Sequence, residues 1–132
     1  MNSAVVTSMG YLVVFVGAGI GGALRHGINI AAARALGVAF PYGTLAVNIT
    51  GGFLMGLIVE YLARKGGFSH HWRLFLTTGI LGGFTTFSAF SVEVALLYQR
   101  GQAALAVGYI LASVLLCVGA LFVGLFIVRA LS

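Results

Sequence analysis

Apolar residues fill four long runs of the chain, and polar and charged residues gather in the short segments between them. The runs extend from about residue 11 to 33, 42 to 63, 74 to 98 and 102 to 128. Each is long enough to cross a bilayer as a helix, which needs about 20 apolar residues. The pattern therefore predicts one all-α integral membrane domain of four transmembrane helices, covering residues 1–132.

The third run contains a stretch that does not suit a continuous helix. Gly79, Gly82, Gly83 and the pair Thr85-Thr86 lie in its middle. Glycine costs a helix roughly 1 kcal/mol relative to alanine, and threonine side chains compete for backbone hydrogen bonds. A break is therefore predicted here. Its free carbonyl groups would have to face protein, water or an ion, and converging carbonyl oxygens suit a small cation such as Na⁺.

A few polar and aromatic side chains recur at helical spacing within the apolar runs. They are Thr44 and Asn48 in the second run, Phe87 and Phe90 in the third, and Tyr109, Ser113 and Cys117 in the fourth. Amide and hydroxyl donors, together with the positive edges of aromatic rings, can form a path of weak anion contacts. The alternatives are an interhelical hydrogen bond for Asn48 and plain packing for the phenylalanines.

Arg25 follows a glycine-rich part of the first run. Gly17 and Gly21 form a pair of small residues four positions apart, a spacing that lets helix backbones approach closely in lipid. Arg25 lies one further turn along the same face. Two interpretations stay open: the guanidinium snorkels to the membrane interface, or it marks the mouth of a polar path.

Composition narrows the class of protein further. With 61% hydrophobic and 7% charged residues, the chain belongs in a lipid bilayer, and its scattered basic residues argue against nucleic acid as a partner. The first ten residues contain no Lys or Arg, so we expect the first run to be a retained span. The chain has no Asp, its two Glu lie far apart, and the adjacent His70 and His71 lack further ligands, so neither an enzyme nor a metal site of side chains is predicted.

The basic residues are nearly balanced between the two sides of the membrane. One side would hold Arg64, Lys65, Arg73 and Arg129, and the other Arg34, Arg100 and, if it lies near the mouth, Arg25. Four charges against three give almost no orientational preference. Such a chain can insert in both directions, and opposed copies could pair as a dual-topology antiparallel homodimer.

Three segments carry a resemblance to a known family. Residues 79–93 (GILGGFTTFSAFSVE), residues 43–51 (GTLAVNITG) and residues 17–25, which end in GGALR, resemble the motifs of the Fluc (CrcB) fluoride-channel family. This resemblance implies a passive fluoride channel of the bacterial inner membrane. It also implies an antiparallel homodimer with two pores, through which cytoplasmic fluoride leaves down its electrochemical gradient.

The resemblance also assigns roles to individual residues. It implies a structural Na⁺ at the dimer centre, held by the backbone carbonyls of Gly82 and Thr85. It implies a fluoride pore lined by Asn48, Phe87, Phe90, Thr44, Tyr109 and Ser113, with Arg25 in the vestibule and Glu93 ending the third motif. Ala89 and Cys117 depart from the usual pattern, because each removes or weakens a hydroxyl contact.

Two rival functions fit parts of the same pattern. A small dual-topology multidrug efflux transporter would also have four spans and balanced charge, but it needs a carboxylate near the middle of a span. Glu60 lies near the end of the second run and Glu93 past the break in the third. A membrane subunit that does not transport would need glycines for packing, but it gives no account of the break, the phenylalanine pair and Asn48 together.

Overall fold

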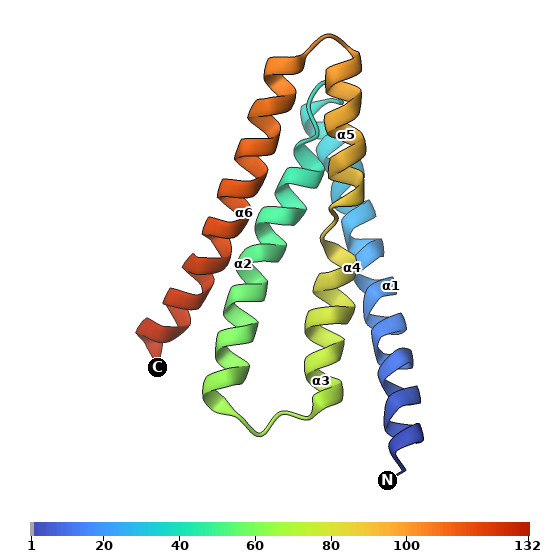
Figure 1. Ribbon diagram of the computed structural model, residues 1–132, viewed down its shortest axis with the longest axis vertical. Coiled ribbons are helices and arrows are strands. Elements are labelled where there is room, and N and C mark those ends of the chain that lie inside the picture. The colour runs from blue at the N-terminus through green and yellow to red at the C-terminus, as the bar shows by residue number, and fades with distance from the viewer. Residues whose placement is uncertain (1) are drawn as a thin grey trace.

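Four antiparallel helical spans make up the protein in a computed structural model that describes residues 2–132. The elements are α1 (Ser3–Leu36), α2 (Tyr42–Lys65), α3 (His70–Leu74), the π-helix η1 (Phe75–Leu81), α4 (Gly82–Phe84), α5 (Ser88–Gln99) and α6 (Ala103–Leu131). Each of the four spans is long and apolar enough to cross a membrane. The predicted all-α class with four membrane helices is confirmed (Figure 1).

The helices extend beyond the apolar runs because local signals, not hydropathy, set their ends. α1 begins at Ser3, where the side chain of Asn2 accepts a hydrogen bond from the Ala4 N–H and caps the first turn. It ends at Gly37, whose φ of 81° lies in the left-handed region that glycine adopts without strain. Gly66 ends α2 in the same way, at a φ of 65°.

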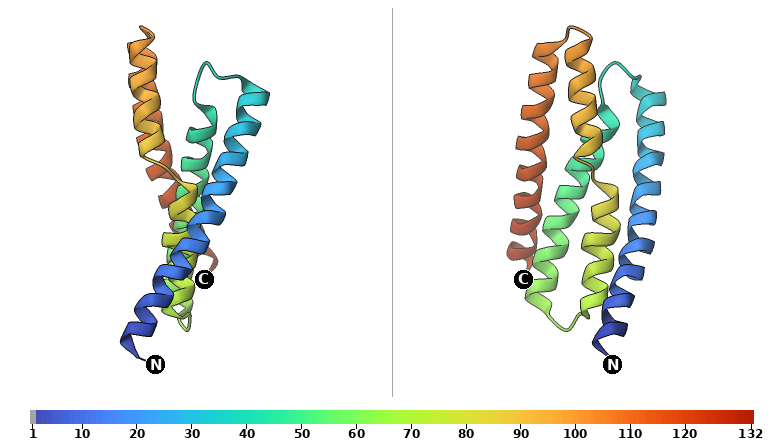
Figure 2. Two further views of the ribbon diagram at one scale, coloured as in Figure 1. Left: turned by 90° about the vertical axis from the view of Figure 1, so that its right-hand side faces the viewer. Right: turned by 45° about the vertical axis from the view of Figure 1, so that its right-hand side comes forward.

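The third span is broken, as the sequence predicts. Its first half runs through α3, η1 and α4, and Thr85 is then extended, with φ −86° and ψ 159°. The second half, α5, begins at Ser88. Above the break, α5 and the adjoining part of α6 lean away from α1 and α2, so the molecule opens like a V in the side view (Figure 2).

Glycines let the backbones of neighbouring helices touch. A Cβ on Gly17 would lie 2.9 Å from the carbonyl oxygen of Phe75, and one on Gly21 would collide with the carbonyl of Ile80. α2 and α6 meet in the same manner, since a Cβ on Gly56 would collide with the carbonyl of Leu121. The close approach predicted for Gly17 and Gly21 is therefore confirmed, and it fixes α1 against the first half of the broken span.

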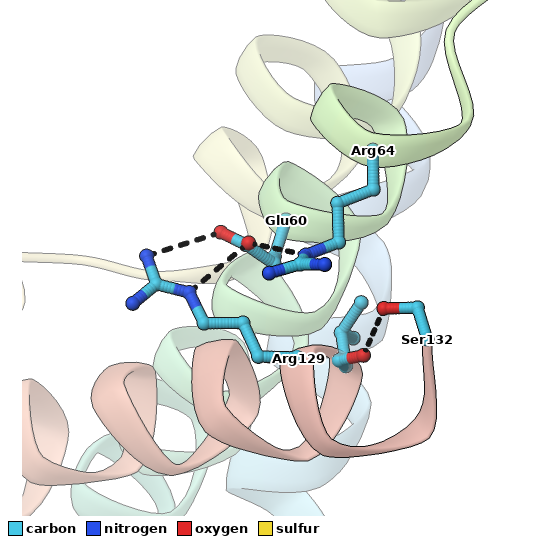
Figure 3. Close-up of polar contacts among 5 residues, drawn as sticks. Glu60, Arg64, Arg129 and Ser132 are labelled. Atoms are coloured by element: carbon cyan, nitrogen blue, oxygen red, sulfur yellow. Dashed lines mark hydrogen bonds and ion pairs between the residues drawn. The ribbon is translucent and has the colours of Figure 1, made fainter.

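An ion-pair cluster joins the ends of α2 and α6. Glu60 accepts hydrogen bonds from Arg64 Nε at 2.8 Å and from Arg129 Nε at 3.1 Å (Figure 3). Beside it, Ser132 Oγ donates to the carbonyl of Val128 at 2.6 Å. The cluster ties the C-terminal end of the last span to α2.

Candidate functional site

Three spans meet at the carboxylate of Glu93. Thr44 Oγ1 on α2 donates a hydrogen bond to Glu93 Oε1, and Tyr109 Oη on α6 donates one to Glu93 Oε2, both at 2.7 Å. Thr44 and Tyr109 are only 2% and 1% exposed. Hydroxyl–carboxyl bonds of this length are among the stronger side-chain hydrogen bonds. Glu93, which the sequence places only at the end of a motif, is thus the residue on which two polar spans converge.

A cavity of about 310 Å³ leads to this carboxylate. It lies between the ends of α1 and α5 and the loop that joins α1 to α2, in the open part of the V. Its lining includes Asn29, Tyr42, Thr44, Glu93 and Arg100. Arg100 follows the last residue of α5, whereas Glu93 lies about two turns earlier on the same helix. The positive charge of this cavity therefore comes from Arg100 at its outer end.

A second hollow, an apolar groove of about 350 Å³, lies beside the break in the third span. Its lining includes Asn48, Thr86, Phe87, Phe90, Ser113 and Cys117. The fold thus brings together in one groove residues that the sequence proposes as pore-lining from the second, third and fourth spans. Thr44 and Tyr109 lie beyond it, at Glu93.

Ser113 is the polar group of this groove that lacks a partner. The residue is 7% exposed, and its Oγ has no hydrogen-bond partner among residues 2–132. Leaving a buried hydroxyl unpaired costs about 1–3 kcal/mol, so such a group is rare without a reason. Ser113 lies one turn from Tyr109 and one turn from Cys117 on α6. Its unpaired hydroxyl therefore lies just beneath the wall of the groove, which the residue helps to line.

Aromatic contacts link the groove to the carboxylate of Glu93, since Phe90 lines the groove and packs on Tyr109, which binds Glu93. Phe90 packs on Tyr109, with their ring centroids 5.1 Å apart, and it is 7% exposed. Phe87 lies 5.3 Å from Phe90 by the same measure but is 77% exposed. Phe90 therefore belongs to the interior, and Phe87 projects from the open side of the groove.

Asn48 binds the backbone of the break at two points. Its Nδ2 donates to the carbonyl of Thr86 at 2.9 Å, and its Oδ1 accepts from the N–H of Thr86 at 2.8 Å. This is the interhelical hydrogen bond that the sequence leaves open as one interpretation. An amide NH₂ carries two hydrogens, so the second remains for the groove that Asn48 also lines.

These contacts free the carbonyls of Gly82 and Thr85. In a continuous helix the two carbonyls would accept from the N–H groups of Thr86 and Ala89, four residues later. Here the Thr86 N–H donates to Asn48, and the Ala89 N–H donates to Thr86 Oγ1 at 3.2 Å. The two carbonyl groups predicted to hold a cation have thus lost their helical donors to side chains.

Arg25 lies at the break. Its Nε donates to the carbonyl of Gly83 at 3.2 Å, and the residue is partly buried. The guanidinium of α1 is therefore bound to the backbone between the two free carbonyls. Sequence spacing places Arg25 on the face of Gly21, which is correct, but it does not reveal this acceptor.

Comparison with known proteins identifies the family. The sequence profile of the CrcB-like protein, Camphor Resistance (CrcB), family matches residues 12–125. The chain belongs to the CrcB family. A relative from Granulibacter bethesdensis, called fluoride-specific ion channel FluC, is 59% identical over 123 residues, which are 93% of this chain and 97% of the relative. A protein of the same name from Rhodopseudomonas palustris is 56% identical over 124 residues, 94% of this chain and 100% of the relative.

A third relative extends this picture. Fluoride-specific ion channel FluC 2 from Nitrobacter hamburgensis is 53% identical over 124 residues, which are 94% of this chain and 100% of the relative. The resemblance to the CrcB family read from the three motifs is thus confirmed. With four membrane-spanning helices and bacterial relatives of this kind, the CrcB protein is a multi-pass protein of the bacterial inner membrane.

The two departures from the family pattern lie in different surroundings. Ala89 lies at the start of α5, and its N–H donates a hydrogen bond to Thr86 Oγ1. Cys117 is half-buried in the groove, and its carbonyl lies 2.8 Å from where a Cβ on Gly52 would be. The thiol therefore continues the polar line of Tyr109 and Ser113 with a weaker donor.

Proposed function

We propose that this CrcB protein is a passive, fluoride-selective channel that exports cytoplasmic fluoride. The observation that carries the proposal is the unpaired hydroxyl of Ser113, buried in a groove between Tyr109 and Cys117. The names of the relatives, fluoride-specific ion channel FluC, favour this function over a multidrug efflux transporter.

The properties of fluoride suit this line of donors. Fluoride is small and strongly hydrated, so its water must be replaced in steps by other donors. Tyr109, Ser113 and Cys117 each carry one hydrogen at intervals of one turn of α6, and Asn48 adds a donor from α2. None of these groups is a fixed positive charge. Weak, repeated contacts allow an ion to enter and also to leave.

Glu93 makes the passage depend on an exchange of hydrogen bonds. The hydroxyl groups of Thr44 and Tyr109 each have one hydrogen, and both hydrogens are given to Glu93. A fluoride ion that reaches these residues competes with the carboxylate for the same donors. The site thereby holds an anion weakly, because binding fluoride costs the hydrogen bond to Glu93.

The groove has an open side that a second copy of the chain would close. Phe87 projects there, and neighbouring residues of α5 and α6 such as Val92, Val114 and Val118 are more than half exposed, at 59%, 51% and 52%. The nearly even distribution of basic residues lets two copies insert in opposite directions. The resulting antiparallel homodimer would cover both grooves by symmetry and give two pores. This assembly is part of the proposal.

The carbonyl groups of Gly82 and Thr85 fit a Na⁺ ion at the dimer centre. Carbonyl oxygens are the hard ligands that such a cation takes, and both have lost their helical donors. Gly82 is exposed on the surface of the single chain, so its carbonyl is within reach of a second copy. The ion would supply a positive charge that joins the two breaks, while the hydrogen bonds of Asn48 hold each break open.

Fluoride efflux from vesicles tests the function. Purified protein is reconstituted into liposomes loaded with potassium fluoride, and efflux is followed with a fluoride-selective electrode after valinomycin is added. We expect rapid fluoride release and no comparable release of chloride from matched vesicles. Equal chloride release, or fluoride release only when a proton gradient is imposed, would contradict a passive selective channel.

A further inference from the structure

Arg25 reaches the break in the third span from α1. α1 and α4 are in backbone contact beside it, since a Cβ on Gly83 would collide with the carbonyl of Ala18, and one on Gly21 would lie 2.7 Å from the backbone N of Phe84. Arg25 lies one turn beyond Gly21, and its Nε is 3.2 Å from the carbonyl oxygen of Gly83. The guanidinium therefore lies beside the end of α4, held there by two helices whose separation cannot easily change.

Arg25 supplies the carbonyl of Gly83 with a donor that the interrupted helix does not provide. α4 ends at Phe84, so the last carbonyl groups of this half-span lose their intrahelical partners. The carbonyl of Leu81 accepts from the N–H and the hydroxyl of Thr85, at 3.1 and 3.0 Å. The carbonyl of Thr86 accepts from Asn48, and that of Gly83 from Arg25. The engaged groups thus surround the two carbonyls, Gly82 and Thr85, that we assign to Na⁺.

The charge of Arg25 has no acidic partner in the described chain. Glu60 is bound by Arg64 and Arg129, and Glu93 by Thr44 and Tyr109. The guanidinium instead takes a neutral carbonyl at a partly buried position, which is an expensive place for a long cationic side chain that could extend to the interface. The contact indicates a specific task at the break.

We propose that Arg25 is a positioning residue for the cation site. By holding the carbonyl of Gly83, it fixes a peptide unit that lies between the carbonyls of Gly82 and Thr85, so that both can face the cation. This inference rests on the proposed function, because the dimer and its Na⁺ belong to that proposal. It differs from a role for Arg25 at the pore mouth, where its charge would act directly on fluoride.

Two variants and one control test the proposal. Arg25→Met removes both the charge and the hydrogen bond, whereas Arg25→Lys keeps the charge but lacks the planar Nε–H that reaches Gly83. Arg34→Met removes the same charge from an exposed position on the same helix and serves as the control. Hydrogen exchange of the backbone at residues 82–90 and the Na⁺ dependence of the dimer, with choline as the replacement ion, are measured for each protein.

Loss of a hydrogen bond from a charged donor should change both the exchange rate at the break and the Na⁺ concentration that the dimer needs by about 10-fold. We expect Arg25→Met and Arg25→Lys to exchange about 10-fold faster at residues 84–86 and to need about 10-fold more Na⁺ to remain dimeric, while Arg34→Met behaves like the parent. If Arg25→Met needs less Na⁺ and Arg25→Lys is unchanged, the charge merely repels the cation and the proposal is wrong.

The remaining outcomes separate this inference from the function on which it rests. A parent dimer that is indifferent to Na⁺ would overturn the cation site itself. A Na⁺-dependent parent whose exchange and Na⁺ requirement are the same in both Arg25 variants would overturn the role of Arg25 alone. An effect of Arg25→Met on fluoride efflux that salt abolishes, with exchange unchanged, would place Arg25 at the mouth and also overturn it.

Discussion

The hydroxyl of Tyr109 donates to the carboxylate of Glu93 across 2.7 Å, between α5 and the adjoining part of α6, which together lean away from α1 and α2 (Figure 2). The Tyr109 ring is at the same time packed between Phe40 and Phe90, with centroid distances of 5.3 and 5.1 Å. The aromatic contacts fix the ring, so the hydroxyl has a defined position beside the proposed path. Packing and polar function are thereby carried by different parts of one side chain.

The first prediction separates these two parts. Tyr109→Phe keeps the ring and its packing but leaves Glu93 with one hydroxyl donor instead of two. We expect fluoride efflux to fall about 10-fold, since one step of the donor line is lost, while the thermal unfolding temperature in detergent changes little. Tyr98→Phe, at a position that is 68% exposed, is the matched control. Unchanged efflux from Tyr109→Phe would show that fluoride does not use this hydroxyl.

Ser113 gives a prediction in which stability and transport move in opposite directions. Its buried hydroxyl has no partner among residues 2–132, so Ser113→Ala removes an unsatisfied group and should stabilise the fold by about 1 kcal/mol. Fluoride efflux should nevertheless fall, because the groove loses a donor. Thermal unfolding and electrode traces measure the two effects. Ser8→Ala, at an exposed hydroxyl on α1, should change neither, and a Ser113→Ala protein with full efflux would contradict the proposed path.

Phe87 provides a test of the aromatic wall. The residue is 77% exposed in the single chain, so Phe87→Ile removes little folding energy but replaces the ring edge beside the groove. We expect fluoride efflux to drop at least about 10-fold with the dimer still assembled, as cross-linking in membranes would show. Phe15→Ile alters a ring of similar exposure, 78%, on α1 and should transport normally. Dissociation of the Phe87→Ile dimer would instead indicate that the ring is structural.

The sequence predicts the spans and the break, but not that Phe90 is buried while Phe87 is exposed. Spacing of three residues places Phe87 and Phe90 on one helical face, yet Phe90 is buried and Phe87 exposed. The two rings do lie together, with centroids 5.3 Å apart, and Phe87 has helical dihedral angles. The difference arises because Phe87 is the N-cap of α5, so no preceding turn of that helix covers its ring. The break is easier to predict, because glycine and threonine disfavour a helix through local properties of each residue.

Contacts between segments far apart in the chain could not be predicted from the sequence, because they depend on how the helices are placed in space. The meeting of Thr44, Glu93 and Tyr109 depends on how far α5 tilts after the break, which no local pattern encodes. The same holds for Arg25: the face that it occupies follows from its spacing to Gly21, but its acceptor depends on α4 ending at Phe84. What could be predicted are elements and faces, and what could not are the distances between them.

The packing of α2 on α6 gives a prediction with an internal control. A Cβ on Gly56 would collide with the Leu121 carbonyl, whereas one on Gly119 would meet nothing within 4 Å. Gly56→Ala should therefore destabilise the fold by about 1–3 kcal/mol, since backbone cannot yield as a side chain does. Gly119→Ala should be neutral or slightly stabilising, because alanine favours the helix. Thermal unfolding in detergent would show the difference, and equal effects of the two substitutions would contradict the close approach of these helices.

Arg100 gives a prediction about salt. It is the basic residue among those lining the cavity that leads to Thr44 and Glu93, so its charge should raise the local concentration of fluoride at the entrance. Arg100→Gln should lower the initial rate of efflux about 2- to 10-fold at low ionic strength. Near 1 M salt, where the screening length is about 3 Å, the difference should vanish. Arg34→Gln removes an equal charge from the exposed last turn of α1, at the same end of the molecule, and should have a smaller effect at every salt concentration. A loss of efflux in Arg100→Gln that persists in high salt would mean that Arg100 acts through a direct contact rather than through its field.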